Sequence, residues 1–280
     1  MDFKRACIFI DGENLRHSLC DLFGTDFNPA DYLPKQANWD AFFSYMIHAA
    51  NVDLRLRAYW YVVDEIDFWP WGISKLLKRR DFVTLERVLR QHKPNISILN
   101  AIPAGSARQA KIIFIAENLV RTEAFLKRRF EGWREIQNGI AHAFESVEFR
   151  RSGSIRVDLF TSRFGQEKGV DVKLATDLLK LEDIYDVGVV VSGDGDYVPA
   201  VQVVKDWGKH IINVSFLKKS GGLLPGGARR LNQMTDRAIE VPYADMARFM
   251  RVKPKTAAAA APATLGTTTA TVAVTPPSGP

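Results

Sequence analysis

Residues 186–201 read DVGVVVSGDGDYVPAV, and this stretch carries the clearest signal for the fold. Its first half is apolar and β-branched, which is typical of a strand buried on both faces of a sheet. Two acids, Asp194 and Asp196, then flank a single glycine. Asp and Gly are turn residues and Asp also caps helices, so the simplest interpretation is a turn. The alternative is a metal site, and the rest of the chain has to decide between the two.

Strand-like and helix-like patterns alternate along the chain. Strands are predicted at 5–11, 53–64, 154–161, 186–192 and 210–216, and helices at 39–51, 73–92, 107–147, 171–182, 196–208 and 227–236. This alternation predicts an α/β fold with a central, mostly parallel sheet and helices on both faces. In such sheets ligands bind at the carboxyl ends of the strands.

Acidic residues fall at those ends. Asp11 ends the first strand, Asp194 and Asp196 follow the strand 186–192, and Asp171 opens the helix after the strand 154–161. Each alone has a plain explanation as a turn, a cap or a solvent-facing side chain. Carboxylates brought together repel one another unless a cation neutralises them, and Mg²⁺ prefers oxygen ligands. We therefore expect these acids to converge on a divalent cation, Mg²⁺ or Mn²⁺.

The composition excludes several classes of protein. The chain has 280 residues, 46% of them hydrophobic, and only two cysteines, too few for a disulfide framework or a cysteine-based zinc site. We expect no signal peptide, because no long apolar stretch follows the basic residues near position 5, and the chain has no run of about 20 apolar residues. We expect a cytoplasmic protein with no membrane partner.

The net charge of +6 is unevenly distributed. Residues 73–164 carry 18 Lys and Arg against 9 Asp and Glu, whereas residues 1–72 carry 6 against 11. Such asymmetry suits a polyanion that one region holds and another processes, although a solvated helix surface would also explain it. The densest basic clusters are Arg79, Arg80, Lys127, Arg128 and Arg129. Nearby Phe130 and Trp133 have the chemistry to stack bases, but their helical spacing is more typical of core.

Three segments carry a family resemblance: IFIDGENL (8–15), KGVDVKLATDLL (168–179) and VVVSGDGDYVPAV (189–201). In this order they resemble the NYN domain, in the LabA-like branch of the PIN-like nucleases, and TDRAIEV (235–241) resembles that family's ending. The resemblance implies a PIN-like three-layer α/β sandwich and metal-dependent ribonuclease chemistry. We expect this domain at 1–251, a basic helical insertion at about 65–153, and a disordered Ala/Thr/Pro-rich tail at 252–280.

The resemblance also implies roles for individual residues. The catalytic acids carry over to Asp11, Asp171, Asp194 and Asp196, of which Asp11, Asp171 and Asp194 are the expected metal ligands. Supporting roles carry over to Asn14, Ser192 and Asp177. Asp177 comes six residues after Asp171, about 600° round a helix, so the two meet only if Asp171 precedes the helix.

Five basic residues are candidates for contacts with substrate phosphates, although each is equally plausible as surface charge. They are Lys168, Lys218, Lys219, Arg229 and Arg230. The leading hypothesis is a ribonuclease, and the main alternative is an RNA-binding regulatory module without turnover. RNA is the expected partner in both, and the sequence leaves open whether the chain forms a homo-oligomer. A haloacid-dehalogenase-like phosphatase fits less well, because position 13 is Glu and that family's usual Thr is absent.

Overall fold

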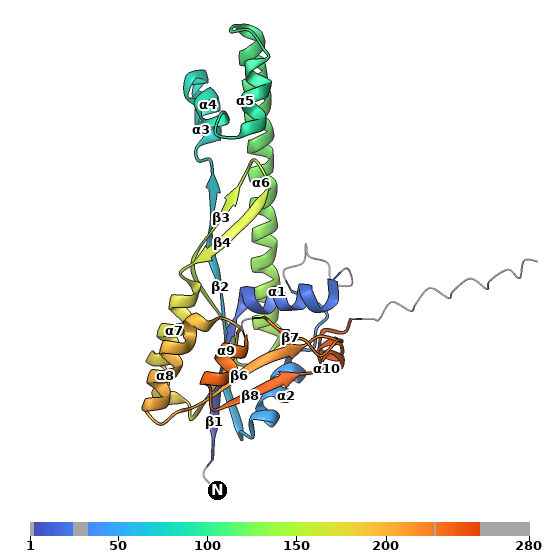
Figure 1. The fold of residues 1–280 in the computed structure, drawn as a ribbon, viewed down its shortest axis with the longest axis vertical. Helices are drawn as coiled ribbons and strands as arrows, with labels where there is room; N and C mark the ends of the chain where they lie inside the picture. The colour runs from blue at the N-terminus through green and yellow to red at the C-terminus, as the bar shows by residue number, and fades with distance from the viewer. Residues whose placement is uncertain (1–2, 25–32, 227, 253–280) are drawn as a thin grey trace, which may run out of the picture.

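A computed structural model describes residues 3–24, 33–226 and 228–252 (Figure 1). The tail expected at 252–280 lies, from residue 253 onward, outside the described residues. The strands are β1 (Arg5–Asp11), β2 (Leu54–Trp69), β3 (Val147–Asp158), β4 (Arg163–Lys168), β5 (Val187–Val191), β6 (His210–Leu217), β7 (Leu223–Leu224) and β8 (Arg237–Val241). The longer helices are α1 (Gly12–Phe23), α2 (Trp39–Ala50), α6 (Ser106–Ala143), α7 (Val170–Lys180) and α8 (Val198–Asp206). Shorter ones are α3 (Ile73–Arg79), α4 (Phe82–Leu89), α5 (Lys93–Asn100), α9 (Ala228–Met234) and α10 (Tyr243–Met250).

The strands form a single sheet in the order β4-β3-β2-β1-β5-β6-β7, and β8 also pairs with β6. The pairs β1–β2, β1–β5, β2–β3, β5–β6 and β6–β8 are parallel, whereas β4 and β7 run antiparallel to their neighbours. The predicted α/β class with a mostly parallel central sheet is therefore confirmed.

The alternating side chains of β2 show how both faces of the sheet are covered. Trp60 lies 4.9 Å from the ring of Trp39 on α2, while its neighbour Tyr61 points the other way and donates to Asp177 on α7. Both are fully buried. Successive side chains of a strand point to opposite faces, so this one stretch anchors a helix on each side of the sheet. The result is a three-layer core.

Part of the chain projects far beyond this core. We call residues 66–126 and 156–164 the arm, residues 71–112 its tip, and the other described residues the body. In Figure 1 the arm rises along the long axis, with α6 running from the tip down to the body. Ten buried residues form a separate hydrophobic cluster within the arm: Ile73, Leu85, Leu89, Leu99, Ile112, Ala116, Leu119, Leu126, Val157 and Leu159. The helices expected as an insertion thus have a core of their own.

Two expected elements differ in detail from those observed. The helix expected over 73–92 is two helices, because Arg80 ends α3 in the left-handed conformation at φ 54°. The strand expected at 154–161 begins earlier, at Val147, and pairs with β2 along most of its length. Phe130 and Trp133 are buried in the body's core, which leaves them unable to stack bases.

Candidate metal centre

Asp11 occupies the carboxyl end of the central strand β1 and is almost completely buried. Its Oδ1 accepts the backbone N–H of Asn14 at 3.1 Å and so caps α1. Its Oδ2 accepts the hydroxyl of Ser192 at 2.8 Å and lies 3.3 Å from the hydroxyl of Tyr197. A buried carboxylate held by donors from three segments is a fixed ligand rather than a flexible surface acid.

Two further acids reach Asp11 from the other side. Asp171 lies in the first turn of α7, and Glu167 lies near the end of β4, just before the turn at Gly169. One carboxylate oxygen from each of Asp11, Glu167 and Asp171 lies within 4.8 Å of the other two. The predicted convergence of Asp11 with Asp171 is thus observed, whereas Glu167 was not anticipated. The available signal was the position of this acid in the chain, four residues before Asp171.

The crowding of these carboxylates shows in their protonation. Burial, together with the charge of Asp171, raises the pKa of Asp11 to about 6, although bonds from Asn14, Ser192 and Tyr197 oppose the shift. Burial and the neighbouring acids Asp11, Glu13 and Asp171 raise the pKa of Glu167 to about 8. Without a counter-charge, the cluster therefore resists full ionisation at neutral pH. Such a site favours either protons or a cation.

Tyr197 closes the cluster, and sequence reasoning gave it no role. Its hydroxyl donates to Oδ1 of Asp171 at 2.7 Å, so one side chain contacts both Asp171 and Asp11. Burial and the charges of Asp11 and Asp171 raise the pKa of Tyr197, which keeps the phenol protonated and able to donate. Its place directly after Asp196, in the GDGDY turn, was the available signal.

The supporting residues Asn14 and Ser192 tie the ends of β1 and β5 together. Oδ1 of Asn14 accepts the N–H of Gly193 at 3.2 Å, and Oγ of Ser192 accepts the N–H of Asp194 at 3.0 Å. Gly193 has no room for a side chain, because an added Cβ would lie 2.1 Å from Cγ of Pro225. These contacts fix the SGDGD turn against the end of β1.

Asp194 and Asp196 lie at the rim of the cluster. Oδ1 of Asp194 accepts the N–H of Asp196 at 2.9 Å and so caps the short 3₁₀ turn Gly195–Tyr197. Asp194 also contributes to the raised pKa of Tyr197, which places its charge near the same centre. Asp196 is exposed. The turn interpretation thus describes the local geometry of Asp194, and its role as a metal ligand stays a prediction.

Asp177 belongs to a different network. It is buried on α7 and accepts hydrogen bonds from Lys173 at 2.7 Å, from Arg150 at 2.5 Å and from Tyr61 at 3.2 Å. Burial alone would raise the pKa of Asp177, but the bonds from Lys173 and Arg150 lower it. Since Asp171 lies within α7 rather than before it, the two acids point in different directions, as the helical angle requires. The contacts of Asp177 are those of a structural ion pair.

Of the candidate phosphate-binding residues, Arg230 lies against the acidic turn. A methyl group on Gly195 would lie 3.1 Å from Cδ of Arg230 and 3.5 Å from its Nη1, so this side chain covers the turn. Lys168 is exposed directly after Glu167, and Arg229 is exposed on α9. Lys218 and Lys219 precede β7, and Nζ of Lys219 lies 4.6 Å from the ring centroid of Tyr243.

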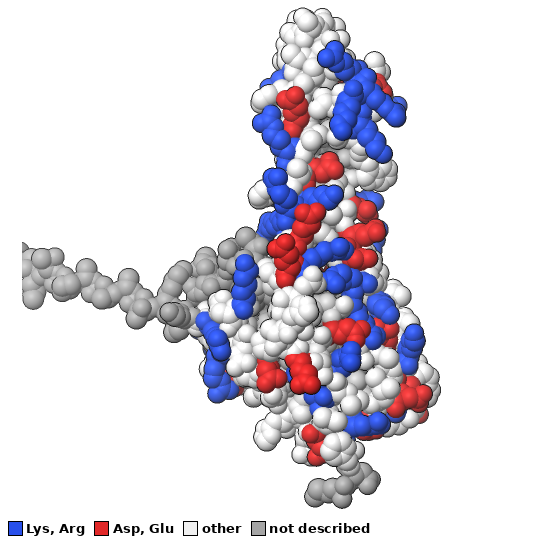
Figure 2. Space-filling model, turned by 180° about the vertical axis from the view of Figure 1, so that it is seen from behind, with Lys and Arg blue, Asp and Glu red and all other residues white. Residues whose placement is uncertain are grey.

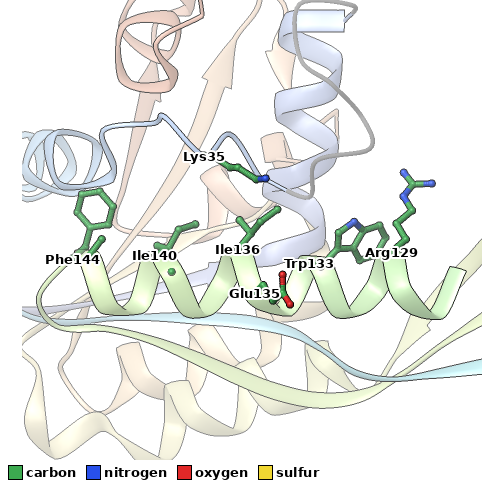
Figure 3. A pocket seen from close by; sticks show the side chains of 10 residues that line it. Lys35, Arg129, Trp133, Glu135, Ile136, Ile140 and Phe144 are labelled. Atoms are coloured by element: carbon green, nitrogen blue, oxygen red, sulfur yellow. The ribbon is translucent and has the colours of Figure 1, made fainter. Parts of the chain in front are cut away.

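A hollow lies away from the acids, beside the lower half of α6. It has a volume of about 620 Å³, and Figure 3 shows Ile136, Ile140 and Phe144 on the α6 side and Lys35 across from them. Glu135 is the one acid in its lining. A wall of apolar side chains with a single carboxylate lacks the convergent oxygen ligands of a hard-metal site. The chemistry is therefore better placed at Asp11, Glu167 and Asp171 than in this hollow.

Comparison with known proteins agrees with this architecture. The sequence model of the NYN domain matches residues 94–231. The chain carries an NYN domain. NYN domains belong to the PIN-like superfamily, so the predicted family and the PIN-like α/β fold are confirmed. The matched segment contains Glu167, Asp171 and Asp194, while Asp11 precedes it and reaches the domain's acids through β1.

Other comparisons add little to the NYN match. No curated protein matches the chain. A crystal structure of a protein of unknown function from Vibrio parahaemolyticus is similar over 85% of this chain and 93% of its own, with 14% identity and a TM-score of 0.41. Among the described residues, no helix combines the length and apolarity needed to cross a membrane.

Proposed function

We propose that this protein hydrolyses RNA phosphodiester bonds with a divalent cation, Mg²⁺ or Mn²⁺, held by Asp11, Glu167 and Asp171. The observation that carries the proposal is the meeting of three carboxylate oxygens within 4.8 Å at the carboxyl edge of the sheet. This edge is where ligands bind in open α/β sheets, and the NYN match supports a nuclease-like fold. Asp194 and Asp196 act from the rim in this proposal.

The donor set fits a hard divalent cation. It consists of carboxylate oxygens, and burial together with neighbouring acids raises the pKa values of Asp11 and Glu167, so a bound cation would stabilise the ionised form. When bound, such an ion activates water and neutralises charge that develops on the phosphate. The chain's own groups fix the ligands: Ser192 donates to Asp11, and Tyr197 donates to Asp171.

The charged rim suits a phosphate backbone. Arg230 overlies the turn that carries Asp194 and Asp196, and exposed Lys168 follows Glu167 directly. Their positive charges would draw an RNA phosphate towards an otherwise acidic centre. They would supply affinity without base preference, because phosphate contacts carry no direct sequence information.

The test is cleavage of single-stranded and structured RNA by the purified full chain in Mg²⁺, in Mn²⁺ and in EDTA. Asp11→Asn, Glu167→Gln and Asp171→Asn should each lower the cleavage rate by roughly a hundredfold or more, the scale on which charge stabilisation in the transition state acts. Asp194→Asn should have a smaller effect. Asp183→Asn is the matched control, since this exposed acid lies on the turn before β5. Equal cleavage by wild type and all three cluster variants would disprove the assignment.

The basic arm favours one alternative, an RNA-binding regulatory module without turnover. Residues 73–112 carry nine Lys and Arg against two acids, a balance suited to binding rather than chemistry. RNA binding that persists in EDTA, with no cleavage in either metal, would support this alternative over the nuclease.

A further inference from the structure

We propose that the tip of the arm is a second RNA-binding surface, which grips the phosphate backbone of a strand whose other end lies at the acidic cluster. The inference deepens the proposed function and rests on it, because it makes RNA that spans the distance between the two sites the preferred substrate. The tip is composed of α3, α4, α5 and the first turns of α6 (Figure 1).

The charge of the tip is not balanced within it. Its two acids, Asp81 and Glu86, are both engaged in holding helices together. Asp81 accepts the N–H of Thr84 at 3.0 Å and caps α4. Oε1 of Glu86 accepts a hydrogen bond from Nη2 of Arg90 at 2.6 Å and lies 3.6 Å from Nη1 of Arg108. The acids thus maintain the scaffold and leave most of the surrounding positive charge uncompensated.

Six of the remaining seven basic side chains of the tip point outward. Lys75, Lys78, Arg79, Arg80, Arg87 and Lys93 are all exposed. Arg79 and Arg87 lie near enough to Asp81 to help lower its pKa, but among the described residues none of the six forms an ion pair within 4 Å. In Figure 2 blue side chains gather at the upper end of the molecule, whereas red and blue alternate lower down the arm. A concentrated, unpaired positive surface is the footprint of polyanion binding.

Local backbone structure concentrates these charges. Arg80 takes the left-handed conformation that ends α3, so Lys78, Arg79 and Arg80 lie together at the turn into α4. The aliphatic core of the arm packs beneath them, with Ile73 and Leu85 fully buried. Beside α3, Trp71 is 69% exposed and available for stacking on a base. The surface thus combines backbone contacts with an aromatic platform.

The arm also sets a distance. Asp11 pairs with Tyr61 in the sheet, and β2 continues eight residues further, to Trp69. At about 3.3 Å per residue this lifts the tip about 26 Å beyond the acidic cluster. A stacked strand advances about 3.4 Å per nucleotide, so RNA must exceed about eight nucleotides to touch both places. Shorter RNA would contact one site at a time.

The experiment compares two triple variants of the full chain that lose the same charge. The tip variant is Lys78→Gln/Arg79→Gln/Arg80→Gln, and the control is Lys4→Gln/Lys180→Gln/Arg237→Gln. Lys4 precedes β1, Lys180 ends α7 and Arg237 begins β8, and all three side chains are exposed. Fluorescence anisotropy in EDTA measures binding of an RNA of about 20 nucleotides. We expect the tip variant to bind about tenfold more weakly and to show a salt slope shallower by about 2 to 3, while the control stays within about twofold of wild type.

A second readout is cleavage in Mg²⁺. The tip variant should raise KM for RNA of about 20 nucleotides and leave cleavage of RNA of about 5 nucleotides unchanged, because the shorter strand cannot span the two sites. Lys75→Gln/Arg87→Gln/Lys93→Gln provides an independent tip variant should the first fail to fold. RNA binding that depends on the tip, without any cleavage, would support the tip as an RNA-binding surface and contradict the proposed nuclease activity.

The opposite results would overturn the inference. Equal RNA affinity of the tip and control variants would do so, as would cleavage that depends on Asp11 but shows no effect of the tip at either length. Because exposed Trp71 and Val83 accompany the charges, vesicles containing phosphatidylserine are included. Tip-dependent binding to these vesicles, without tip-dependent binding to RNA, would assign the surface to membranes and reject the proposal.

Discussion

The body and the arm are built from different kinds of core. The body buries large aromatic side chains between strands and helices that are far apart in sequence, such as Phe42 on α2 against Phe216 on β6. The arm buries ten aliphatic residues, eight of them within the continuous segment 73–126. The two cores share β2, β3 and α6 as their physical connection.

The two cores match the different requirements of the acidic cluster in the body and of the basic surface on the tip. Asp11 must meet Glu167 and Asp171, which lie more than 150 residues further along the chain, to within a few ångströms, and the body's sheet provides that precision. The tip only has to present positive charge, for which a small helical unit with local contacts suffices. Units with fewer buried contacts open at lower free energy, so we expect the arm to unfold before the body.

The largest expected effect comes from truncating one leucine in each core. Leu174 on α7 and Leu85 on α4 are both fully buried. Leu174→Ala and Leu85→Ala should each cost about 3 kcal/mol of the free energy of unfolding, but of different units. Hydrogen exchange should show faster exchange in β1, β5 and α7 for the first variant, and only in α3–α6 for the second.

Exposed Val83 supplies the control, since Val83→Ala should alter stability by less than about 0.5 kcal/mol. If Leu85→Ala accelerates exchange in β1 and β5 as much as Leu174→Ala does, the arm and the body form one cooperative unit and the comparison is wrong.

A smaller effect should distinguish the two regions by pH. The pKa values of Asp11 and Glu167 in the folded body, about 6 and about 8, lie above the unfolded values of about 4. Between these values the folded protein binds more protons than the unfolded chain, so the free energy of unfolding of the body should fall by on the order of 2 kcal/mol from pH 5 to pH 8. The pKa values of Glu13 and Asp177 are lowered in the folded protein, so these two groups change the free energy of unfolding only at lower pH.

Thermal melts at pH 5 and pH 8, with and without Mg²⁺, measure this effect. Mg²⁺ should restore more stability at pH 8, where fewer protons compete with it for the carboxylates. Glu167→Gln should flatten the pH dependence, whereas Glu117→Gln, an exposed acid on the arm's part of α6, should leave it intact. A metal-free melting temperature that rises from pH 5 to pH 8 would contradict the crowding of the cluster.

The sequence predicted the body's chemistry better than the arm's shape. Asp11 was found because it ends a strongly apolar strand, and Asp171 because it opens the helix after the strand 154–161 and lies in the KGVD segment of the resemblance. The resemblance gave Asp177 a supporting role, although helical geometry already placed it on another face from Asp171. The break at Arg80 was not anticipated, because a left-handed non-glycine residue leaves no clear pattern.

Glu167 and Tyr197 escaped prediction for a different reason. Glu167 reaches the site because edge strand β4 turns back antiparallel along β3, and this pairing contains a bulge between Ile155 and Val157. A bulge shifts which side chains face inward, so alternation alone could not place Glu167. Tyr197 lies in a turn, where its direction depends on the capping bond to Asp194 rather than on any periodicity.

The smallest expected effect tests Tyr197 against a matched tyrosine of the body. Tyr197→Phe removes the hydroxyl that donates to Asp171 at 2.7 Å, and Tyr185→Phe removes one that donates to the carbonyl of Leu178 at the same distance. Each should lower the free energy of unfolding by about 1 kcal/mol, the usual net value of a buried hydrogen bond. Calorimetric Mg²⁺ titration should separate them, with weaker affinity for Tyr197→Phe alone.

Each variant removes one hydrogen bond of the same length, but the surroundings of the two hydroxyls differ. Tyr185 holds two backbone segments together, and the phenol of Tyr197 lies between two carboxylates that repel each other. Loss of the Tyr197 hydroxyl lets Asp171 move away from Asp11. Binding of Mg²⁺ then has to bring the two carboxylates back together, which weakens the affinity. If both variants bind Mg²⁺ as tightly as wild type, Tyr197 is a core tyrosine like Tyr185, and the spacing of the acids is fixed by the ends of β1 and α7 alone.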